Sequence, residues 1–255
     1  MIIAVLGLGE AGGLISAGLV AAGAEVRGYD PRVTPPAGVQ KCGSDAEACS
    51  GAAVVLSVNS AADAPDALAQ GLPGCSPGTL WADLNTASPG EKLALERAAG
   101  GRVRVIDVAL MSPVPGHGLF TPMTASGPAA DAYAEVMRPL GARVEVLDGP
   151  VGSAATHKLF RSVFYKGLAA AVLEATAAAR AAGLSDWLRG NITEELIRAD
   201  ADTLQRLLTG SKTHAARRIH EMEAAGRLLD DLGVPARVTR ASRDWLTDLA
   251  DGAEP

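Results

Sequence analysis

The sequence predicts an α/β domain with a doubly wound, mostly parallel sheet, followed by a smaller all-α domain. Through the first 150 residues, apolar runs of strand length alternate with helical stretches, which is the pattern of a parallel sheet with helices on both faces. After Gly149 the strand pattern stops, and residues 154–182 form one Ala-rich helical run that ends at Gly183. We therefore expect two domains, residues 1–150 and residues 151–255, joined by a long helix.

Seven strands are expected in the first domain, each a short and mostly apolar run. They span residues 2–6, 24–29, 52–58, 79–84, 102–110, 122–127 and 142–149. The connection at residues 31–40 contains three prolines and is predicted to hold no regular element, because proline removes a backbone donor. Beyond the long helix, we expect helices near residues 193–208, 212–232 and 237–250.

The turn after the first strand carries glycines at G-x-G-x-x-G spacing. In such a turn the first glycine permits the tight bend, the second lets a pyrophosphate approach the backbone, and the third lets the helix pack on the strand. The helix starts near Ala11, so its unpaired N–H groups face the phosphates. This order of elements predicts a Rossmann dinucleotide site rather than a glycine-rich turn that binds nothing. The cofactor-binding residues predicted here are Gly7, Leu8, Gly9, Glu10, Ala11 and Gly12.

The acidic residue at the end of the second strand indicates which cofactor binds. Asp30 lies 18 residues after Gly12, where a carboxylate accepts hydrogen bonds from the adenosine ribose. Because a carboxylate repels a 2′-phosphate, the sequence favours NAD. Arg32 follows two residues later and is placed to bind that phosphate, so NADP is left open.

Three further loops are expected at the same edge of the sheet, since ligands of such sheets bind outside the carboxyl ends of the strands. Val58 and Asn59 follow the third strand, and Asn85 and Thr86 follow the fourth. We expect these four residues to contact the ribose or the nicotinamide; for the two asparagines the alternative is simple loop polarity. The third loop, residues 111–118, is expected to contact substrate.

A lysine near the start of the long helix is the candidate for acid–base chemistry. Lys158, Ser162 and Lys166 recur every four residues and share one helix face. A lysine beside the cofactor would exchange a proton with a carbonyl oxygen while nicotinamide transfers hydride. The alternative is a solvated lysine on the helix surface.

Charge and cysteine content exclude several classes of function. The net charge is −6, and the first 150 residues hold 15 acidic and 9 basic side chains, which argues against binding to nucleic acid or to an anionic membrane. The three cysteines form no C-x-x-C pair, so we expect neither a metal site nor a disulfide framework. The chain starts inside its first strand, and no signal peptide or membrane span is predicted. A cytoplasmic location is expected.

The order of motifs resembles the β-hydroxyacid dehydrogenase family, the 3-hydroxyisobutyrate dehydrogenase-like proteins. The motifs are GLGEAGG, YDP, VLSVNS, DLNTASP, DVALMSP and GSAATHK. The tail resembles a subgroup with a 6-phosphogluconate-dehydrogenase-like domain of unknown function, through KLFRSVFYKG and ARRIHEMEAAGRLLDDLGVP. The resemblance implies a Rossmann domain, an all-helical second domain that forms dimers, and NAD(P)-dependent oxidation of small β-hydroxy acids. Lys158 matches the catalytic lysine of the family.

The sequence departs from the family at the expected substrate-binding positions. A Ser-Gly-Gly loop is replaced by Met111-Ser112-Pro113, and proline has no N–H group with which to bind a carboxylate. Ser112 and His117 are the candidates to replace that loop. The family has an asparagine four residues after the lysine, where this chain has Ser162. The family also has a Lys-Asp pair in the second domain, where this chain has His220-Glu221.

These observations favour an NAD(P)-dependent dehydrogenase or reductase that acts on CH–OH groups. We expect it to transfer hydride between nicotinamide and a small, anionic hydroxy acid or its oxo partner, with Lys158 as general acid/base. The predicted substrate-binding residues are Ser112, His117, Ser162 and His220. The alternatives are an imine reductase-like enzyme and a non-catalytic dinucleotide-sensing protein. The expected partner is a second copy of the chain, bound through the helical domain.

Overall fold

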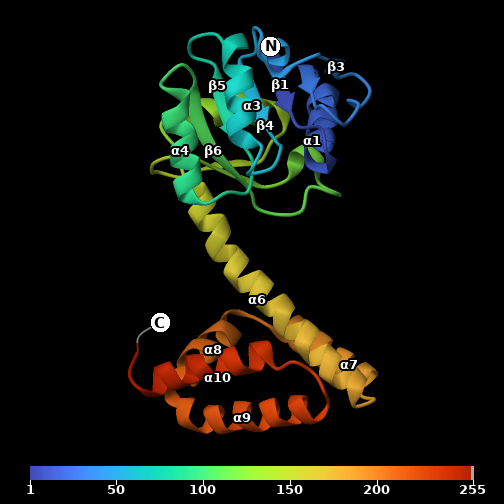
Figure 1. The fold of residues 1–255 in the computed structure, drawn as a ribbon, viewed down its shortest axis with the longest axis vertical. Coiled ribbons are helices and arrows are strands. Elements are labelled where there is room, and N and C mark those ends of the chain that lie inside the picture. The colour runs from blue at the N-terminus through green and yellow to red at the C-terminus, as the bar shows by residue number, and fades with distance from the viewer. Residues whose placement is uncertain (254–255) are drawn as a thin grey trace. The chain divides into compact units, whose positions relative to one another are not determined.

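The structure is a computed structural model that describes residues 1–253, and these residues form two compact units. The first unit is Met1–Arg161, and the second begins at Ser162. By sequence the boundary was placed after residue 150, whereas the division by packing falls inside the long helix α6 (Ser153–Ala181). Both units are drawn in Figure 1.

The first unit is built on one eight-stranded sheet with the order β3-β2-β1-β4-β5-β6-β7-β8. Every neighbouring pair is parallel except β6 and β7, which are antiparallel. The fold class is therefore confirmed as a doubly wound, mostly parallel sheet followed by helices. The strands are β1 (Ile2–Leu6), β2 (Glu25–Tyr29), β3 (Gln40–Lys41), β4 (Val54–Ser57), β5 (Leu80–Asp83), β6 (Arg104–Leu110), β7 (Met123–Ser126) and β8 (Val144–Val146).

The prediction for the proline-rich connection was wrong. Its last residue, Gln40, begins β3, which pairs with β2 through Arg27 with Gln40 and through Gly28 with Lys41. The strand is only two residues long and lies at the edge of the sheet. Edge strands need few ladder hydrogen bonds, so the prolines before β3 do not prevent it.

Helices cover both faces of the sheet. Alternate residues of β1 point to opposite sides: Ile3 and Val5 belong to one apolar core, and Ala4 and Leu6 to the other. Side chains of α1 (Glu10–Ala21) and α5 (Ala130–Met137) complete the first core. The second core is completed by α2 (Asp45–Cys49), α3 (Ala64–Gly71) and α4 (Pro89–Ala99). Short 3-10 turns at Leu72–Gly74, Gly118–Phe120 and Arg138–Leu140 join these elements.

The second unit consists of helices in its described part, to Ala253. They are the end of α6, α7 (Ser185–Arg198), α8 (Ala201–Thr213), α9 (Ala215–Asp231) and α10 (Arg237–Ala250). The single helix predicted at residues 193–208 was wrong, because the chain ends α7 and starts α8 inside that range. Asp200 caps α8, and its carboxylate accepts a hydrogen bond from the backbone N–H of Thr203 at 2.8 Å.

A carboxylate of α6 binds the start of α10. Glu174 accepts hydrogen bonds from the backbone N–H groups of Val238 and Thr239, both at 2.8 Å, and from the hydroxyl of Thr239 at 2.7 Å. Burial by itself would raise the pKa of Glu174, but these hydrogen bonds outweigh it and hold that pKa below its usual value. No helix among residues 1–253 is long and apolar enough to cross a lipid bilayer.

Candidate dinucleotide and acid–base site

The glycine turn has the geometry that its spacing predicts. Gly7 has φ +90°, in the left-handed region, and its N–H donates to the carbonyl of Tyr29 at 2.9 Å. A Cβ at Gly12 would lie 1.9 Å from the carbonyl oxygen of Gly7, whereas a Cβ at Gly9 would meet nothing within 4 Å. Gly12 is therefore needed for packing, and Gly9 borders open space. The helix α1 starts at Glu10 without a side-chain cap, so its first N–H groups remain available to an anion.

Asp30 holds this turn together as well as facing the cofactor pocket. Its carboxylate accepts hydrogen bonds from the backbone N–H groups of Leu8 and Arg32, each at 2.8 Å, and of Val33 at 3.0 Å. Burial alone would raise the pKa of Asp30, but the three hydrogen bonds outweigh it and lower that pKa. The carboxylate is thus ionised at neutral pH, and its remaining lone pair, on Oδ2, can accept a ribose hydroxyl. The sequence predicted the ligand role but not the structural one.

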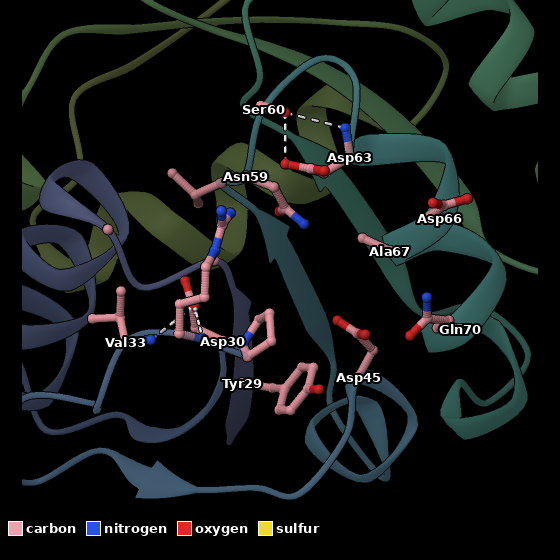
Figure 2. Close-up of a pocket in the computed structure, with 15 residues that line it drawn as sticks. Tyr29, Asp30, Val33, Asp45, Asn59, Ser60, Asp63, Asp66, Ala67 and Gln70 are labelled. Carbon is pink, nitrogen blue, oxygen red and sulfur yellow. Dashed lines mark hydrogen bonds between the residues drawn. The ribbon is translucent and has the colours of Figure 1, made fainter.

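A pocket of about 670 Å³ lies beside the glycine turn and Asp30 (Figure 2). This volume is within the ordinary range for small-molecule sites. Six predicted cofactor residues line it: Gly7, Gly9, Asp30, Arg32, Val58 and Asn59. The opposite wall was not predicted and comes from α3 and the residue before it, with Asp63, Asp66, Ala67 and Gln70. Their spacing is that of one helix face, so the signal was present in the sequence.

A buried carboxylate also borders this pocket. Asp45, the first residue of α2, is 6% exposed and lines the pocket together with Asp30. Burial raises the pKa of Asp45, and the negative charge of Asp30 adds to that rise. The pocket therefore has an acidic wall, against the single guanidinium of Arg32.

A second pocket, of about 250 Å³, continues along the same sheet edge. It shares Gly9, Val58 and Asn59 with the first pocket, so the two are adjacent. Its other lining residues are Glu10, Ala11, Leu84, Asn85, Thr86, Leu110 and Lys158. All of these residues belong to the first unit. The structure therefore brings the predicted lysine, the α1 N-terminus and the loops after β4 and β5 to one pocket.

Lys158 is half-buried and has a defined partner in that pocket. Its ammonium donates a hydrogen bond to the hydroxyl of Thr86 at 2.8 Å. Thr86 follows β5, whereas Lys158 lies in the second turn of α6. The contact fixes the lysine at the carboxyl edge of the sheet, where a general acid/base would be needed.

A buried ionic cluster beneath this pocket was missed by sequence reasoning. The ammonium of Lys92, on α4, lies 2.6 Å from a carboxylate oxygen of Asp83 and 3.2 Å from one of Asp107. All three side chains are 2% exposed or less. A fully buried lysine is rare, and nothing in its sequence context marks it.

Two predicted residues of the first unit are not brought to these two pockets. Ser112 and His117 line neither of them. The hydroxyl of Ser112 is buried and has no hydrogen-bond partner within residues 1–253, and His117 is exposed. Ser162 and His220 belong to the second unit, where the imidazole of His220 is 81% exposed. Their role in substrate binding stays a prediction. In the described part of the chain, no group of three or more His, Cys, Asp or Glu side chains is arranged to hold a metal ion.

The first unit is thus a dinucleotide-binding domain by fold and by pocket, and comparison with known proteins agrees. Residues 2–116 match the NAD binding domain of 6-phosphogluconate dehydrogenase, and residues 179–249 match a domain of unknown function, DUF1932. The chain thus carries these two domains in this order, which agrees with the family and subgroup that the motif order predicted. The predicted nicotinamide cofactor is confirmed.

Individual relatives are distant. An uncharacterized 28.5 kDa protein of Methanothermus fervidus is 29% identical over 143 residues, which are 56% of this chain and 55% of that protein. The match thus spans about half the length of this curated relative. A solved conserved hypothetical protein from Sinorhizobium meliloti 1021 is 29% identical, with a TM-score of 0.63 over 97% of this chain and 87% of its own. An imine reductase from Streptomyces aurantiacus is 20% identical, with a TM-score of 0.78 over 98% of this chain and 95% of its own.

Proposed function

We propose that the chain is an NAD(P)-dependent oxidoreductase that acts on CH–OH groups, with Lys158 as general acid/base. The substrate of this proposal is a small, anionic hydroxy acid or its oxo partner. One observation carries the proposal: Lys158 lines the same pocket as Gly9 and Ala11 of the dinucleotide turn. An ammonium fixed at the nicotinamide end of such a site can transfer a proton during hydride transfer. A site that only binds a nucleotide has no need of such a group.

The two adjacent pockets suggest how the cofactor lies. Asp30 would accept an adenosine ribose hydroxyl, and the N–H groups at the start of α1 would hold the pyrophosphate. Asn59, Asn85 and Thr86 would hold the nicotinamide end, which would supply the hydride donor or acceptor. In reduction, the ammonium of Lys158 would donate a proton to the carbonyl oxygen of the substrate and become the neutral amine. In oxidation, the neutral amine would accept the proton of the substrate hydroxyl and become the ammonium. Its hydrogen bond to Thr86 orients the nitrogen for either step.

The acidic wall of the larger pocket supports NAD over NADP. Asp30 and Asp45 both border it, and Asp63 and Asp66 line the far side, against Arg32. A 2′-phosphate adds two negative charges beside these carboxylates, and the repulsion weakens its binding. Tight binding of NADPH with no affinity for NADH would contradict this preference.

The second unit is proposed to bind substrate and to form a homodimer. Large apolar side chains of its helices are more than half exposed in the single chain: Val163, Phe164, Leu173, Trp187, Leu196 and Ile197. Exposed apolar surface of this kind is typical of association sites. Ser162 and His220 are the proposed substrate contacts of this unit, and Ser112 and His117 those of the first. A cytoplasmic location stays a prediction.

A panel of hydroxy acids, aldehydes and imines, followed by the nicotinamide absorbance with either cofactor, tests the proposal. Turnover of hydroxy acids or their oxo partners would support it. Turnover of imines alone would favour the imine reductase-like alternative and contradict the CH–OH assignment. Cofactor binding without turnover of any compound would favour a dinucleotide-sensing protein.

A further inference from the structure

We infer that Lys92 is a positioning residue, whose buried ammonium holds the loop after β5 and the first turn of α6 in register and thereby places Lys158. The effect of Lys92 on turnover rests on the proposed function of Lys158, whereas its effect on the start of α6 does not.

Lys92 contacts two neighbouring strands, at the last residue of β5 and in the middle of β6. Its ammonium donates to the backbone carbonyl of Asp83 at 2.9 Å and to the carboxylate of the same residue at 2.6 Å. The carboxylate of Asp107, on β6, lies 3.2 Å away. One cation therefore faces two carboxylates in a place that water does not reach, so loss of the cation would leave two buried like charges side by side.

The cluster is connected to α6 through backbone hydrogen bonds. The N–H of Ala155 donates to the carboxylate of Asp107 at 2.8 Å, and the N–H of Ala154 donates to the hydroxyl of Ser126 at 2.9 Å. These two strand residues satisfy N–H groups of the first turn of α6, which otherwise have no partner inside the helix. The excess negative charge of the cluster also lies at the positive end of a 29-residue helix. Lys158 follows Ala155 by three residues, so it lies on the same side of the helix.

The other side of the cluster is connected to the cofactor loops. The amide nitrogen of Asn85 donates to the carboxylate of Asp83 and, at 3.0 Å, to the hydroxyl of Ser57. That hydroxyl in turn donates to the side-chain oxygen of Asn59 at 3.2 Å. Thr86, the next residue after Asn85, accepts the hydrogen bond from Lys158. The cluster thus links both loops and the helix that meet at the smaller pocket.

The test compares Lys92→Met with two matched controls. Lys41→Met changes an exposed lysine of β3, and Leu95→Ala opens a cavity one turn further along the same helix, α4. Amide hydrogen exchange of the peptide over residues 153–158 is measured by mass spectrometry, with the global unfolding free energy of each variant. For Lys92→Met we expect exchange on the order of tenfold faster than in Leu95→Ala at matched stability. Without the cation, the two buried carboxylates repel each other and one takes up a proton, which weakens the hydrogen bonds that the cluster accepts from α6. Equal exchange in the two variants overturns the inference.

Turnover gives a second readout that a merely structural role would not change. Relative to Leu95→Ala, we expect Lys92→Met to lower kcat by a larger factor than it raises the Kd for NADH, because Lys158 and the loop after β5 move whereas the glycine turn and Asp30 do not. If Lys92→Met fails to fold, Asp107→Asn removes one charge at constant size, and faster exchange over residues 153–158 is again expected. Unchanged exchange in that variant also overturns the inference. If no substrate is turned over by the unmodified chain, the proposed function fails while the exchange result still decides on Lys92.

Discussion

The two units differ in how much of their apolar surface each covers by itself. In the first unit, two apolar cores fill both faces of the sheet, and large side chains such as Trp81 and Tyr133 are fully buried. In the described part of the second unit, the buried apolar side chains are Ala179, Ala215, Leu229 and Ala236, whereas the larger ones are mostly exposed. The first unit therefore has a core of its own, whereas the second leaves apolar helix faces exposed in the single chain.

The largest expected effect tests the chemistry assigned to the first unit. Lys158→Ala should lower kcat by about 10²- to 10⁴-fold, the usual contribution of a general acid/base, because it removes the ammonium bonded to Thr86. The Kd for NADH, measured by fluorescence titration, should stay close to that of the unmodified chain. Lys41→Ala serves as a control at an exposed lysine. Near-normal turnover by Lys158→Ala would remove the lysine from its proposed role.

A glycine substitution separates binding from folding in the first unit. A Cβ at Gly9 meets nothing within 4 Å, so Gly9→Ala should fold normally. It should nevertheless weaken NADH binding by about tenfold or more, because the methyl group occupies the path of the pyrophosphate and costs hydrogen bonds to it. Gly190→Ala, at an equally open position on α7, is the matched control. Unchanged affinity in Gly9→Ala would mean that the pyrophosphate does not cross this turn.

Cofactor preference is the next effect in size. Asp30→Asn removes the charge that opposes a 2′-phosphate and keeps the side-chain volume, so the ratio of NADPH to NADH affinity should rise by about tenfold. Titration of both cofactors measures the ratio. Some loss of thermal stability is expected as well, since the weaker acceptor also bonds to Leu8, Arg32 and Val33. A ratio that does not move would show that Asp30 only holds the turn.

A charge on the exposed helix face tests the second unit. Ile197 on α7 is 79% exposed, and Ile197→Asp should weaken a dimer that buries this face by about tenfold or more, because it places a carboxylate in an apolar contact. Thr193→Asp adds the same charge at another exposed position of α7. Sedimentation velocity over a range of concentrations measures both variants. An unmodified chain that stays monomeric throughout would contradict the dimer.

The smallest effect concerns acid stability of the second unit. The pKa of Glu174 is lowered in the folded state, so this carboxylate stabilises the fold at neutral pH. That contribution is lost as the pH falls below the usual glutamate range and through the lowered pKa. Glu174→Gln should therefore be less stable than the unmodified chain at pH 7. Between pH 5 and 3, a range set by the usual glutamate pKa of about 4.3, its stability should fall less steeply than that of the unmodified chain. Urea unfolding at several pH values, with Glu195→Gln as an exposed control, measures the slopes.

The sequence predicted those parts of the fold and the site that follow from the order of strands, turns and helices along the chain. The glycine turn, Asp30, Lys158 and the loops after β4 and β5 follow from strand and helix periodicity, because parallel strands bring their carboxyl ends to one edge. The Lys92 cluster could not be predicted, because its members come from α4, β5 and β6 and meet only through packing. Within the second unit, the break at Asp200 was missed because the apolar residues on either side of it fit the period of one continuous helix. The N-cap formed by Asp200 nevertheless starts a new helix.

The most direct measurement is a crystal structure of the chain with bound NADH. We expect the adenosine beside Asp30, the pyrophosphate over Gly9, and the nicotinamide in the pocket lined by Asn85, Thr86 and Lys158. The proposal would be contradicted by a nicotinamide ring that lies outside this pocket, so far from Lys158 that one substrate could not contact both.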